Sequence, residues 1–206
     1  MKAMLEFWYE FASTYSYPAA MRIEALAEAA GVEVVLRPFL LGPLFGEQQG
    51  LHDSPFNAFP VKGRYMWRDL ERVCEAHDIP FARPSVFPRN GLLAARVAVA
   101  GLDEGWTPAF TRLVYQANFV RDEDIASREV LAPLVTEAGG DAEAAFEQAA
   151  SEGVKARLRG HVDIARSKGI FGAPSFVASD GELFWGHDRI DQALDWAVTH
   201  QTREFA

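Results

Sequence analysis

The first part of the chain alternates between strand-like and helix-like hydrophobic patterns. The segment Leu5–Phe11 is rich in aromatic residues, which favours a β-strand. The alanine-rich segment Tyr17–Ala30 carries apolar residues at helical spacing and ends at Gly31, a common helix stop. A second strand is predicted over Val32–Phe39. Strand, helix and strand in this order predict a βαβ unit with parallel strands and a right-handed crossover.

The middle of the chain has a different pattern. Residues Leu41–Gly63 combine glycines and prolines without clear periodicity, which predicts a long loop, and loops of this length are usually functional or disordered. From Arg64 to about Ala165 the apolar spacing is helical throughout. After a first helix that begins near Arg64, the predicted helices are Leu92–Leu102, Pro108–Phe119, Glu129–Ala138, Ala142–Ala149 with Asp141 as its N-cap, and Glu152–Lys168.

The end of the chain returns to strands. Pro174–Ala178 and Glu182–Trp185 flank an Asp-Gly turn and predict a hairpin, and Asp188–His200 predicts an amphipathic helix. The order βαβ, helical block, ββα is the layout of an α/β thioredoxin fold with a large all-helical insertion. Residues 1–45 and 168–206 are expected to form the thioredoxin-like domain, 46–59 a connecting active-site loop, and 60–167 the inserted helical domain.

Composition narrows the class of protein. Apolar residues make up 49% of the chain, and its net charge of −9 argues against nucleic acid or an anionic membrane as the main partner. No apolar run is long enough for a membrane span, and Met1–Glu10 does not resemble a signal peptide, so a cytoplasmic protein is expected. The single cysteine, Cys74, lies on a predicted apolar helix face and is expected to be buried and inert. The histidines show no metal-ligand spacing, so no metal is expected.

Two positions stand at junctions between predicted elements. Ser13 lies where a strand passes into a helix, and the free N–H groups at a helix start favour anions. The alternative is that Ser13 or Ser16 is simply the N-cap. Pro174 opens a strand and is a candidate cis-proline, which would expose the backbone of Ala173 to a peptide-like ligand. The alternative is an ordinary proline at a strand start.

Four segments, in order along the whole chain, resemble 2-hydroxychromene-2-carboxylate isomerases and kappa-class glutathione transferases. These families share the thioredoxin-like fold of disulfide oxidoreductases, and in them a serine replaces the first cysteine of Cys-x-x-Cys. Thr14 departs from the proline that is common in the family. The matching segments are Phe11–Tyr17 with Ser13, Pro60–Met66 with Lys-Gly-x-Tyr, the cis-proline loop Gly172–Pro174, and Phe184–Arg189 with Trp-Gly-x-Asp-Arg.

The resemblance implies glutathione as the cofactor and Ser13 as the catalytic residue, whose hydroxyl stabilises the glutathione thiolate. The remaining glutathione contacts that it implies are Ala173 and Pro174 to the cysteinyl unit, Asp188 to the glutamyl ammonium, His187 to the glutamyl carboxylate, and Lys62 to a carboxylate of the glycyl end or of the substrate. Further candidate substrate or loop contacts are Tyr15, Ser54, Asn57, Arg64, Trp67 and Arg189, and Tyr65 is expected to join Tyr15 and Trp67 in an aromatic wall.

Some of these residues, and the neighbouring Trp185, also have a simpler interpretation. The alternatives are Lys62 and Arg64 as solvated surface charges, Asp188 as an N-cap, Trp185 as a core residue, and Arg189 as a structural ion-pair partner.

The leading functional hypothesis is a glutathione-dependent isomerase. The thiolate adds to a double bond of an unsaturated aromatic carboxylate, the resulting single bond rotates, and elimination releases the isomer. One alternative is a kappa-like glutathione transferase or peroxidase, and another is a non-catalytic thioredoxin-like module that binds a peptide. The resemblance also implies a homodimer.

Overall fold

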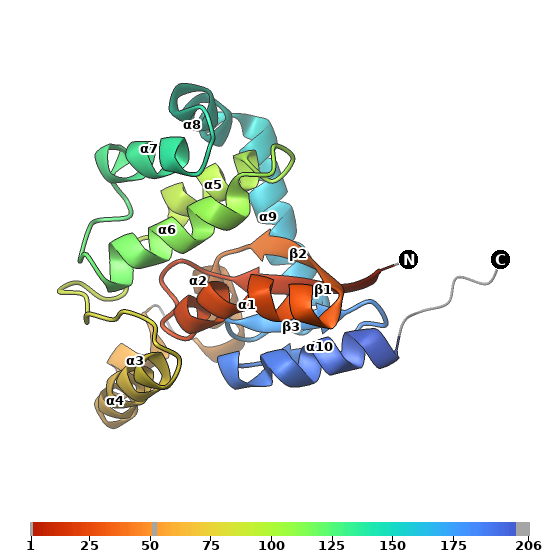
Figure 1. Cartoon of the computed structure of the whole chain (residues 1–206). Helices are drawn as coiled ribbons and strands as arrows, with labels where there is room; N and C mark the ends of the chain where they lie inside the picture. The colour runs from red at the N-terminus through yellow and green to blue at the C-terminus, as the bar shows by residue number, and fades with distance from the viewer. Residues whose placement is uncertain (1, 51–52, 201–206) are drawn as a thin grey trace.

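The computed structural model describes residues 2–50 and 53–200. Within these residues a four-stranded sheet has the order β2-β1-β3-β4, and its strands are β1 (Ala3–Tyr9), β2 (Val32–Pro38), β3 (Ser175–Ala178) and β4 (Leu183–Trp185). Strand β1 pairs in parallel with β2 and antiparallel with β3, and β3 pairs antiparallel with β4. Helix α1 (Ser16–Ala30) connects β1 to β2 (Figure 1), so the predicted βαβ unit and the C-terminal hairpin are confirmed.

A series of helices is inserted between β2 and β3. They are α2 (Leu41–Gln49), α3 (Pro55–Ala58), α4 (Pro60–Ala76), α5 (Leu92–Ala100), α6 (Thr107–Phe119), α7 (Arg128–Glu137), α8 (Ala142–Ala150) and α9 (Glu152–Ser167). After β4, a 3₁₀ turn (His187–Arg189) leads into α10 (Ile190–Thr199). This topology confirms the thioredoxin-like α/β fold with a helical insertion. The domain boundaries remain a prediction, and of the residues that they assign, 1, 51–52 and 201–206 lie outside the described part of the chain.

The side chains of β1 alternate between two buried cores, as the strand period requires. Leu5, Phe7 and Tyr9 face the larger core, which includes residues of α1, α6 and α10. Trp8 faces the smaller core, where it meets Phe39 and residues of α2 and α9. Full burial of such a side chain contributes roughly 1.5–3 kcal/mol to stability. Packing on both faces therefore fixes the position of β1 and of its C-terminal end.

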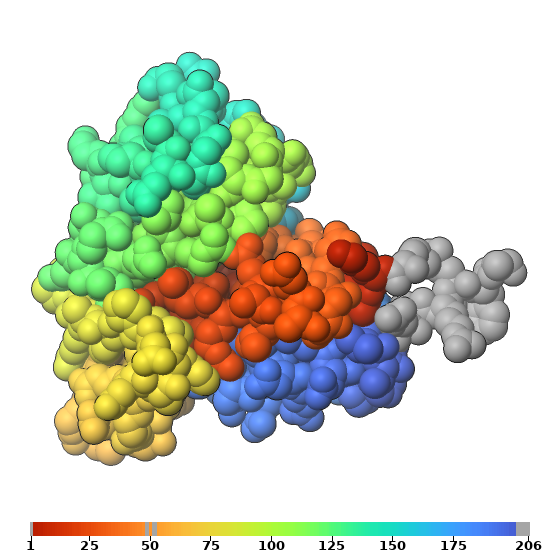
Figure 2. Space-filling view, in the orientation of Figure 1, coloured from red at the N-terminus to blue at the C-terminus, as the bar shows by residue number. Residues whose placement is uncertain are grey.

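Figure 2 shows how the inserted helices are distributed around the thioredoxin-like part of the chain. Residues of α6 to α8 form one lobe beside α1, and residues of α3, α4 and the following segment form a smaller lobe near the start of α1. In the described part of the chain, no helix combines the length and the apolar character that membrane crossing requires. The same residues contain no cluster of three or more histidine, cysteine or acidic side chains suited to a metal.

The prediction of a long loop over Leu41–Gly63 is wrong, because this segment holds α2, α3 and the start of α4. Gly50 ends α2 in the left-handed conformation, with φ of 64°. Pro55 and Pro60 occupy first-turn positions of α3 and α4, where a missing N–H costs nothing. Helices as short as α2 and α3 do not develop a clear apolar period, so the sequence pattern does not distinguish their glycines and prolines from those of a loop.

Several predicted ends are also settled by the structure. Strand β1 ends at Tyr9 rather than Phe11, because the N–H of Ser13 donates to the C=O of Glu10 over 3.0 Å and closes a turn. Gly31 ends α1 with φ of 69°, as predicted. The predicted cap of α8 is confirmed, since the Asp141 carboxylate accepts a hydrogen bond from the N–H of Ala144.

Cys74 is buried in the larger core, as predicted. Burial raises the pKa of its thiol to about 12, so the thiolate form is strongly disfavoured at neutral pH. The prediction that this sulfur is inert is therefore supported by its surroundings.

Candidate functional site

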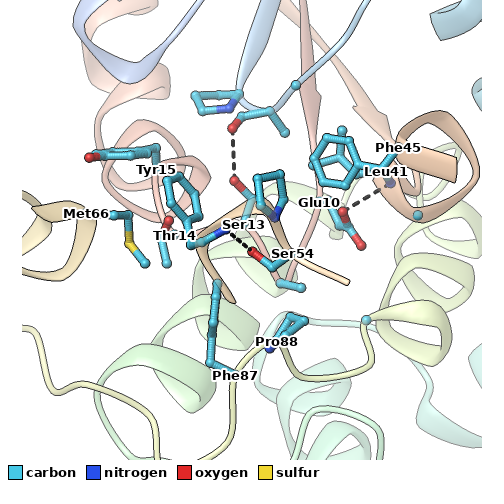
Figure 3. A pocket seen from close by; sticks show the side chains of 18 of the residues that line it. Glu10, Ser13, Thr14, Tyr15, Leu41, Phe45, Ser54, Met66, Phe87 and Pro88 are labelled. Carbon is cyan, nitrogen blue, oxygen red and sulfur yellow. Dashed lines mark hydrogen bonds between the residues drawn. The ribbon is translucent and has the colours of Figure 1, made fainter. Parts of the chain in front are cut away.

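A cavity of about 900 Å³ opens at the C-terminal end of β1. Its wall combines the β1–α1 turn, the helices α2 to α4, a loop before α5, and the two loops that flank β3 and β4 (Figure 3). The sequence-predicted site residues that line it are Ser13, Tyr15, Ser54, Lys62, Ala173, Pro174, His187, Asp188 and Arg189. Segments far apart in the sequence are thus brought to one concave surface.

The hydroxyl of Ser13 joins two of these segments. Its Oγ donates to the C=O of Ala173 over 3.0 Å (Figure 3). The same Oγ accepts a hydrogen bond from the N–H of Ser16 over 3.3 Å. The peptide bond between Ala173 and Pro174 is cis, as the sequence suggested. The N-cap of α1 is Tyr15, so the interpretation of Ser13 or Ser16 as the N-cap is wrong. The Ser13 hydroxyl instead bonds the first N–H of the helix from the preceding turn and lies on the cavity wall, where the helix dipole favours an anion.

Lys62 reaches the cavity because α3 and α4 approach each other closely. A Cβ at Gly63 would lie 2.2 Å from the carbonyl oxygen of Phe56, so only glycine permits this packing. The Nζ of Lys62 lies 5.7 Å from the centroid of the Phe56 ring. Arg64, also on α4, is exposed and does not line the cavity. The Lys-Gly-x-Tyr segment thus has a structural reason for its glycine.

The segment after β4 brings His187 and Asp188 to the cavity wall, where His187 lies against Tyr15. Gly186 allows this turn with φ of 118°, a conformation that other residues rarely adopt. The His187 ring stacks on Tyr15, with centroids 5.3 Å apart and planes 9° from parallel. Burial lowers the pKa of His187. Among the described residues its Nδ1 has no hydrogen-bond partner.

The alternative roles of the neighbouring residues can now be compared with the structure. Asp188 lies within the 3₁₀ turn and does not cap α10, so the N-cap interpretation is wrong. Arg189 forms an ion pair with Asp188 at 3.7 Å, as its alternative role predicted. Trp185 is 52% exposed, so its assignment to the core is wrong. It lines the cavity instead, beside the Phe171 ring, whose centroid lies 4.9 Å away.

A hydrogen-bonded link ties α1 to α4 at this wall. The hydroxyl of Tyr15 donates to Oδ2 of Asp69 over 2.9 Å, and Arg72 donates to the other carboxylate oxygen over 2.9 Å. Burial alone would raise the pKa of Asp69, but the hydrogen bonds from Arg72 and Tyr15 hold it below its ordinary value. Asp69 is therefore a fixed anion that orients the Tyr15 ring.

Asn57 and Trp67 do not line the cavity but support its wall from behind. The amide of Asn57 donates to the C=O of Phe87 over 3.1 Å, which connects α3 to the loop before α5. Trp67 is buried and packs edge-on against Phe87, with centroids 4.9 Å apart. Tyr65 lines the cavity with a largely exposed ring, so the predicted aromatic wall contains Tyr15 and Tyr65 but not Trp67.

Sequence reasoning missed Glu10, Asp69 and the loop Phe87–Gly91, all of which line the cavity. Glu10 follows β1, and its Oε2 accepts a hydrogen bond from the N–H of Leu41 over 3.1 Å (Figure 3). Burial raises the pKa of Glu10 to about 7, although the Leu41 N–H opposes this shift. The available signal was an acidic residue inside an aromatic run, directly before the turn that carries Ser13.

The fold and this cavity define a thioredoxin-like protein with a serine in the turn before its first helix. Residues 4–196 match the family described as the DSBA-like thioredoxin domain. The chain belongs to this family.

Relatives of the chain include an isomerase and a glutathione transferase. The chain is 27% identical over 191 residues to a 2-hydroxychromene-2-carboxylate isomerase from Sphingobium xenophagum, covering 93% of this chain and 96% of the relative. It is 25% identical over 201 residues to glutathione S-transferase kappa 1 from Rattus norvegicus, covering 91% and 88%. A solved structure of a 2-hydroxychromene-2-carboxylate isomerase superposes with a TM-score of 0.83 at 22% identity, covering 95% of this chain and 94% of the other, which supports the shared fold.

Proposed function

We propose that this chain is a glutathione-dependent isomerase that acts on an unsaturated aromatic carboxylate. The observation that carries the proposal is the position of the Ser13 hydroxyl at the start of α1, on the cavity wall and opposite the Ala173 carbonyl. Among the described residues that line the cavity, none is a cysteine. Thiol chemistry at this place therefore requires a sulfur that the ligand brings.

Glutathione binding is expected to exchange one hydrogen bond for another. The cysteinyl N–H of glutathione donates a hydrogen bond to the Ala173 carbonyl. The Ser13 hydroxyl then rotates away from that carbonyl and donates to the sulfur. A free thiol has a pKa of roughly 8.5 and is mostly protonated at neutral pH. The Ser13 hydroxyl and the dipole of α1 both favour the thiolate, so they lower the pKa of the bound thiol.

The charged ends of glutathione find complementary groups on different walls. Asp188, from the 3₁₀ turn, suits the glutamyl ammonium, and the unpaired Nδ1 of His187 suits the glutamyl carboxylate. Lys62, from α4, suits the glycyl carboxylate or the carboxylate of the substrate. A ligand of alternating charge is thereby held along the cavity with its sulfur at Ser13.

The reaction follows from the position of that sulfur. The thiolate adds to an activated double bond, and its electron pair forms the C–S bond while the π electrons move onto the conjugated carbonyl. Rotation about the new single bond and expulsion of the thiolate give the isomer and return glutathione unchanged. A cavity of about 900 Å³ lies near the top of the usual range for ligand sites, which supports room for a second molecule. Tyr15, Tyr65 and Trp185 are available to flank a flat substrate.

The test is the isomerisation of 2-hydroxychromene-2-carboxylate, followed by absorbance with and without glutathione. Activity is expected only with glutathione, and glutathione should not be consumed. Full activity in its absence would contradict the proposal.

A kappa-like glutathione transferase or peroxidase is the second candidate, because the similarity to the rat kappa transferase covers nearly the whole chain. Stoichiometric consumption of glutathione with an aryl halide or a peroxide would favour it. A non-catalytic peptide-binding module predicts no calorimetric response to glutathione. The homodimer and the cytoplasmic location remain predictions.

A further inference from the structure

Glu10 and Ser13 are the first and last residues of one tight turn. The N–H of Ser13 donates to the C=O of Glu10 over 3.0 Å, and such a turn brings the two Cα atoms within about 7 Å. Both residues line the cavity, and Figure 3 shows the Ser13 hydroxyl directed to the Ala173 carbonyl and the Glu10 carboxylate directed to Leu41. The Glu10 carboxyl group therefore lines the same cavity as the place proposed for the glutathione sulfur and belongs to the same backbone turn as Ser13.

Two other elements hold Glu10 in this position. The hydroxyl of Tyr115, on α6, donates to its C=O over 2.8 Å. The N–H of Leu41, the first residue of α2, donates to its carboxylate over 3.1 Å. The backbone and the side chain are thus fixed independently, which is the preorganisation that a proton-transfer group needs.

We propose that Glu10 is the proton acceptor for the glutathione thiol, an inference that rests on the proposed function. When glutathione binds, the S–H bond breaks, an O–H bond forms on the Glu10 carboxylate, and the sulfur remains as thiolate beside Ser13. The pair keeps a single negative charge throughout. The proton returns to the sulfur when glutathione leaves, so no external acid or base is consumed.

The other acidic groups on the cavity wall are less suited to this role. The carboxylates of Asp53 and Asp69 each accept from two neighbouring groups, and that of Asp188 pairs with a cation, whereas among the described residues the Glu10 carboxylate accepts from one neutral N–H, that of Leu41. The donors are Ser54 and Asn57 to Asp53, Tyr15 and Arg72 to Asp69, and Arg189 to Asp188. Burial raises the pKa of Glu10 to about 7, close to the ambient pH at which acid–base exchange is most efficient. Of the other ionisable groups on the wall, Lys62, Arg89 and Arg189 are cations, and burial keeps His187 largely neutral.

A purely structural role for Glu10 is the alternative, because its carboxylate caps the start of α2 through Leu41. The Glu10→Gln variant separates the two roles. The glutamine carbonyl still accepts the Leu41 N–H, but the side chain no longer binds a proton. Glu47→Gln is the matched control, because Glu47 lies on α2, the helix whose start Glu10 holds, but pairs with Arg166 outside the cavity lining.

The experiment counts the protons released when glutathione binds, by calorimetric titration in buffers of different ionisation enthalpy. At about pH 7.5 the carboxyl of Glu10 is mostly ionised and takes up the thiol proton, so the wild type and Glu47→Gln should release about 0.1–0.2 protons per glutathione. Glu10→Gln should release nearly one proton per glutathione, because the thiol proton then goes to solvent. His187 is unchanged in all three proteins, so the difference isolates Glu10.

The wild type alone provides a second test, which does not require the variant to fold. At about pH 6 the carboxyl of Glu10 is already protonated, so binding should release nearly one proton, and this number should fall towards zero at about pH 7.5. The ultraviolet absorbance of the thiolate should accompany binding at both values. Equal proton release at both pH values, or in wild type and Glu10→Gln, or binding without thiolate absorbance, overturns the inference. Absence of glutathione binding overturns the proposed function itself.

Discussion

The hydroxyl of Ser13 donates a hydrogen bond of 3.0 Å to the carbonyl of Ala173, 160 positions later in the sequence. The first residue lies in the β1–α1 turn and the second directly before β3. The antiparallel pairing of β1 with β3, in which Trp8 lies opposite Ser175, brings these two loops to the same end of the sheet. The strand pairing therefore aligns the serine with the backbone group that is proposed to hold the ligand.

Ser13→Ala should weaken the glutathione-dependent reaction. The variant loses the hydroxyl that is proposed to donate to the thiolate, and hydrogen bonds to charged groups contribute about 1.5–3 kcal/mol. A fall in kcat/KM of about 10- to 100-fold is expected from steady-state kinetics. The pKa of the bound thiol, read from thiolate absorbance, should rise at the same time.

Ser151→Ala is the matched control for Ser13. Ser151 caps α9 through the N–H of Val154 and does not line the cavity. Its removal should cost about 1 kcal/mol of stability and leave kcat/KM within about twofold of wild type. Equal losses of activity in both serine variants would indicate that Ser13 acts only through the stability of α1.

Lys62 and Arg64 provide a matched pair of cations on α4, because Lys62 lines the cavity and Arg64 does not. Lys62→Met should raise the Kd of glutathione, or the KM of the carboxylate substrate, by about two- to fivefold through loss of an exposed charge pair. Arg64→Met should change neither. Calorimetry and steady-state kinetics measure the two constants, and the larger effect identifies which carboxylate Lys62 holds. Equal behaviour of the two variants would show that Lys62 is a solvated surface charge.

Gly63→Ala should destabilise the wall that carries Lys62. The added Cβ would lie 2.2 Å from the backbone oxygen of Phe56, so α3 and α4 must separate. Overpacking of this kind costs about 1–3 kcal/mol, measurable by urea denaturation. Gly160→Ala, in α9, is the control, because a Cβ there meets nothing within 4 Å and should stabilise the helix by up to about 1 kcal/mol. Similar unfolding free energies for both variants would contradict the close packing of α3 on α4.

Stability should depend on pH through Glu10. Its pKa is about 7 in the folded state and 4.5 as its ordinary value, so the folded chain binds more protons between these values. The free energy of unfolding therefore falls as pH rises through this window, by about 2 kcal/mol between pH 5 and pH 8. Measured by urea denaturation, the free energy of unfolding of Glu10→Gln relative to the wild type should rise by that amount across the same pH range. Parallel pH profiles would show that the carboxyl is not desolvated.

Much of the fold was predictable because its elements are long and their patterns strong. The aromatic alternation of β1, the alanine-rich α1 ending at Gly31 and the Asp-Gly hairpin each carry a local signal with a physical cause. Ser13 and Pro174 were recognisable for the same reason, since each stands at a junction between two clear elements.

The remaining site residues depend on contacts that the sequence does not encode locally. Glu10 gains its raised pKa from burial in the folded chain, and its carboxylate is held by the N–H of Leu41, 31 positions later, in a helix that the pattern did not reveal. Trp185 has the composition of a core residue, but only the tertiary structure shows that it lies on the cavity rim. Asn57 serves the cavity from behind, through Phe87, and no spacing rule connects those two positions.

Burial of Cys74 also determines how this protein should respond to oxidants. The chain has one cysteine, and its thiol is enclosed in the core with its pKa raised to about 12. Peroxides and disulfides attack accessible thiolates, so the folded polypeptide offers them little reactive sulfur. Oxidative loss of activity should therefore follow the depletion of reduced glutathione, and fresh glutathione should restore it without any protein disulfide having to be reduced.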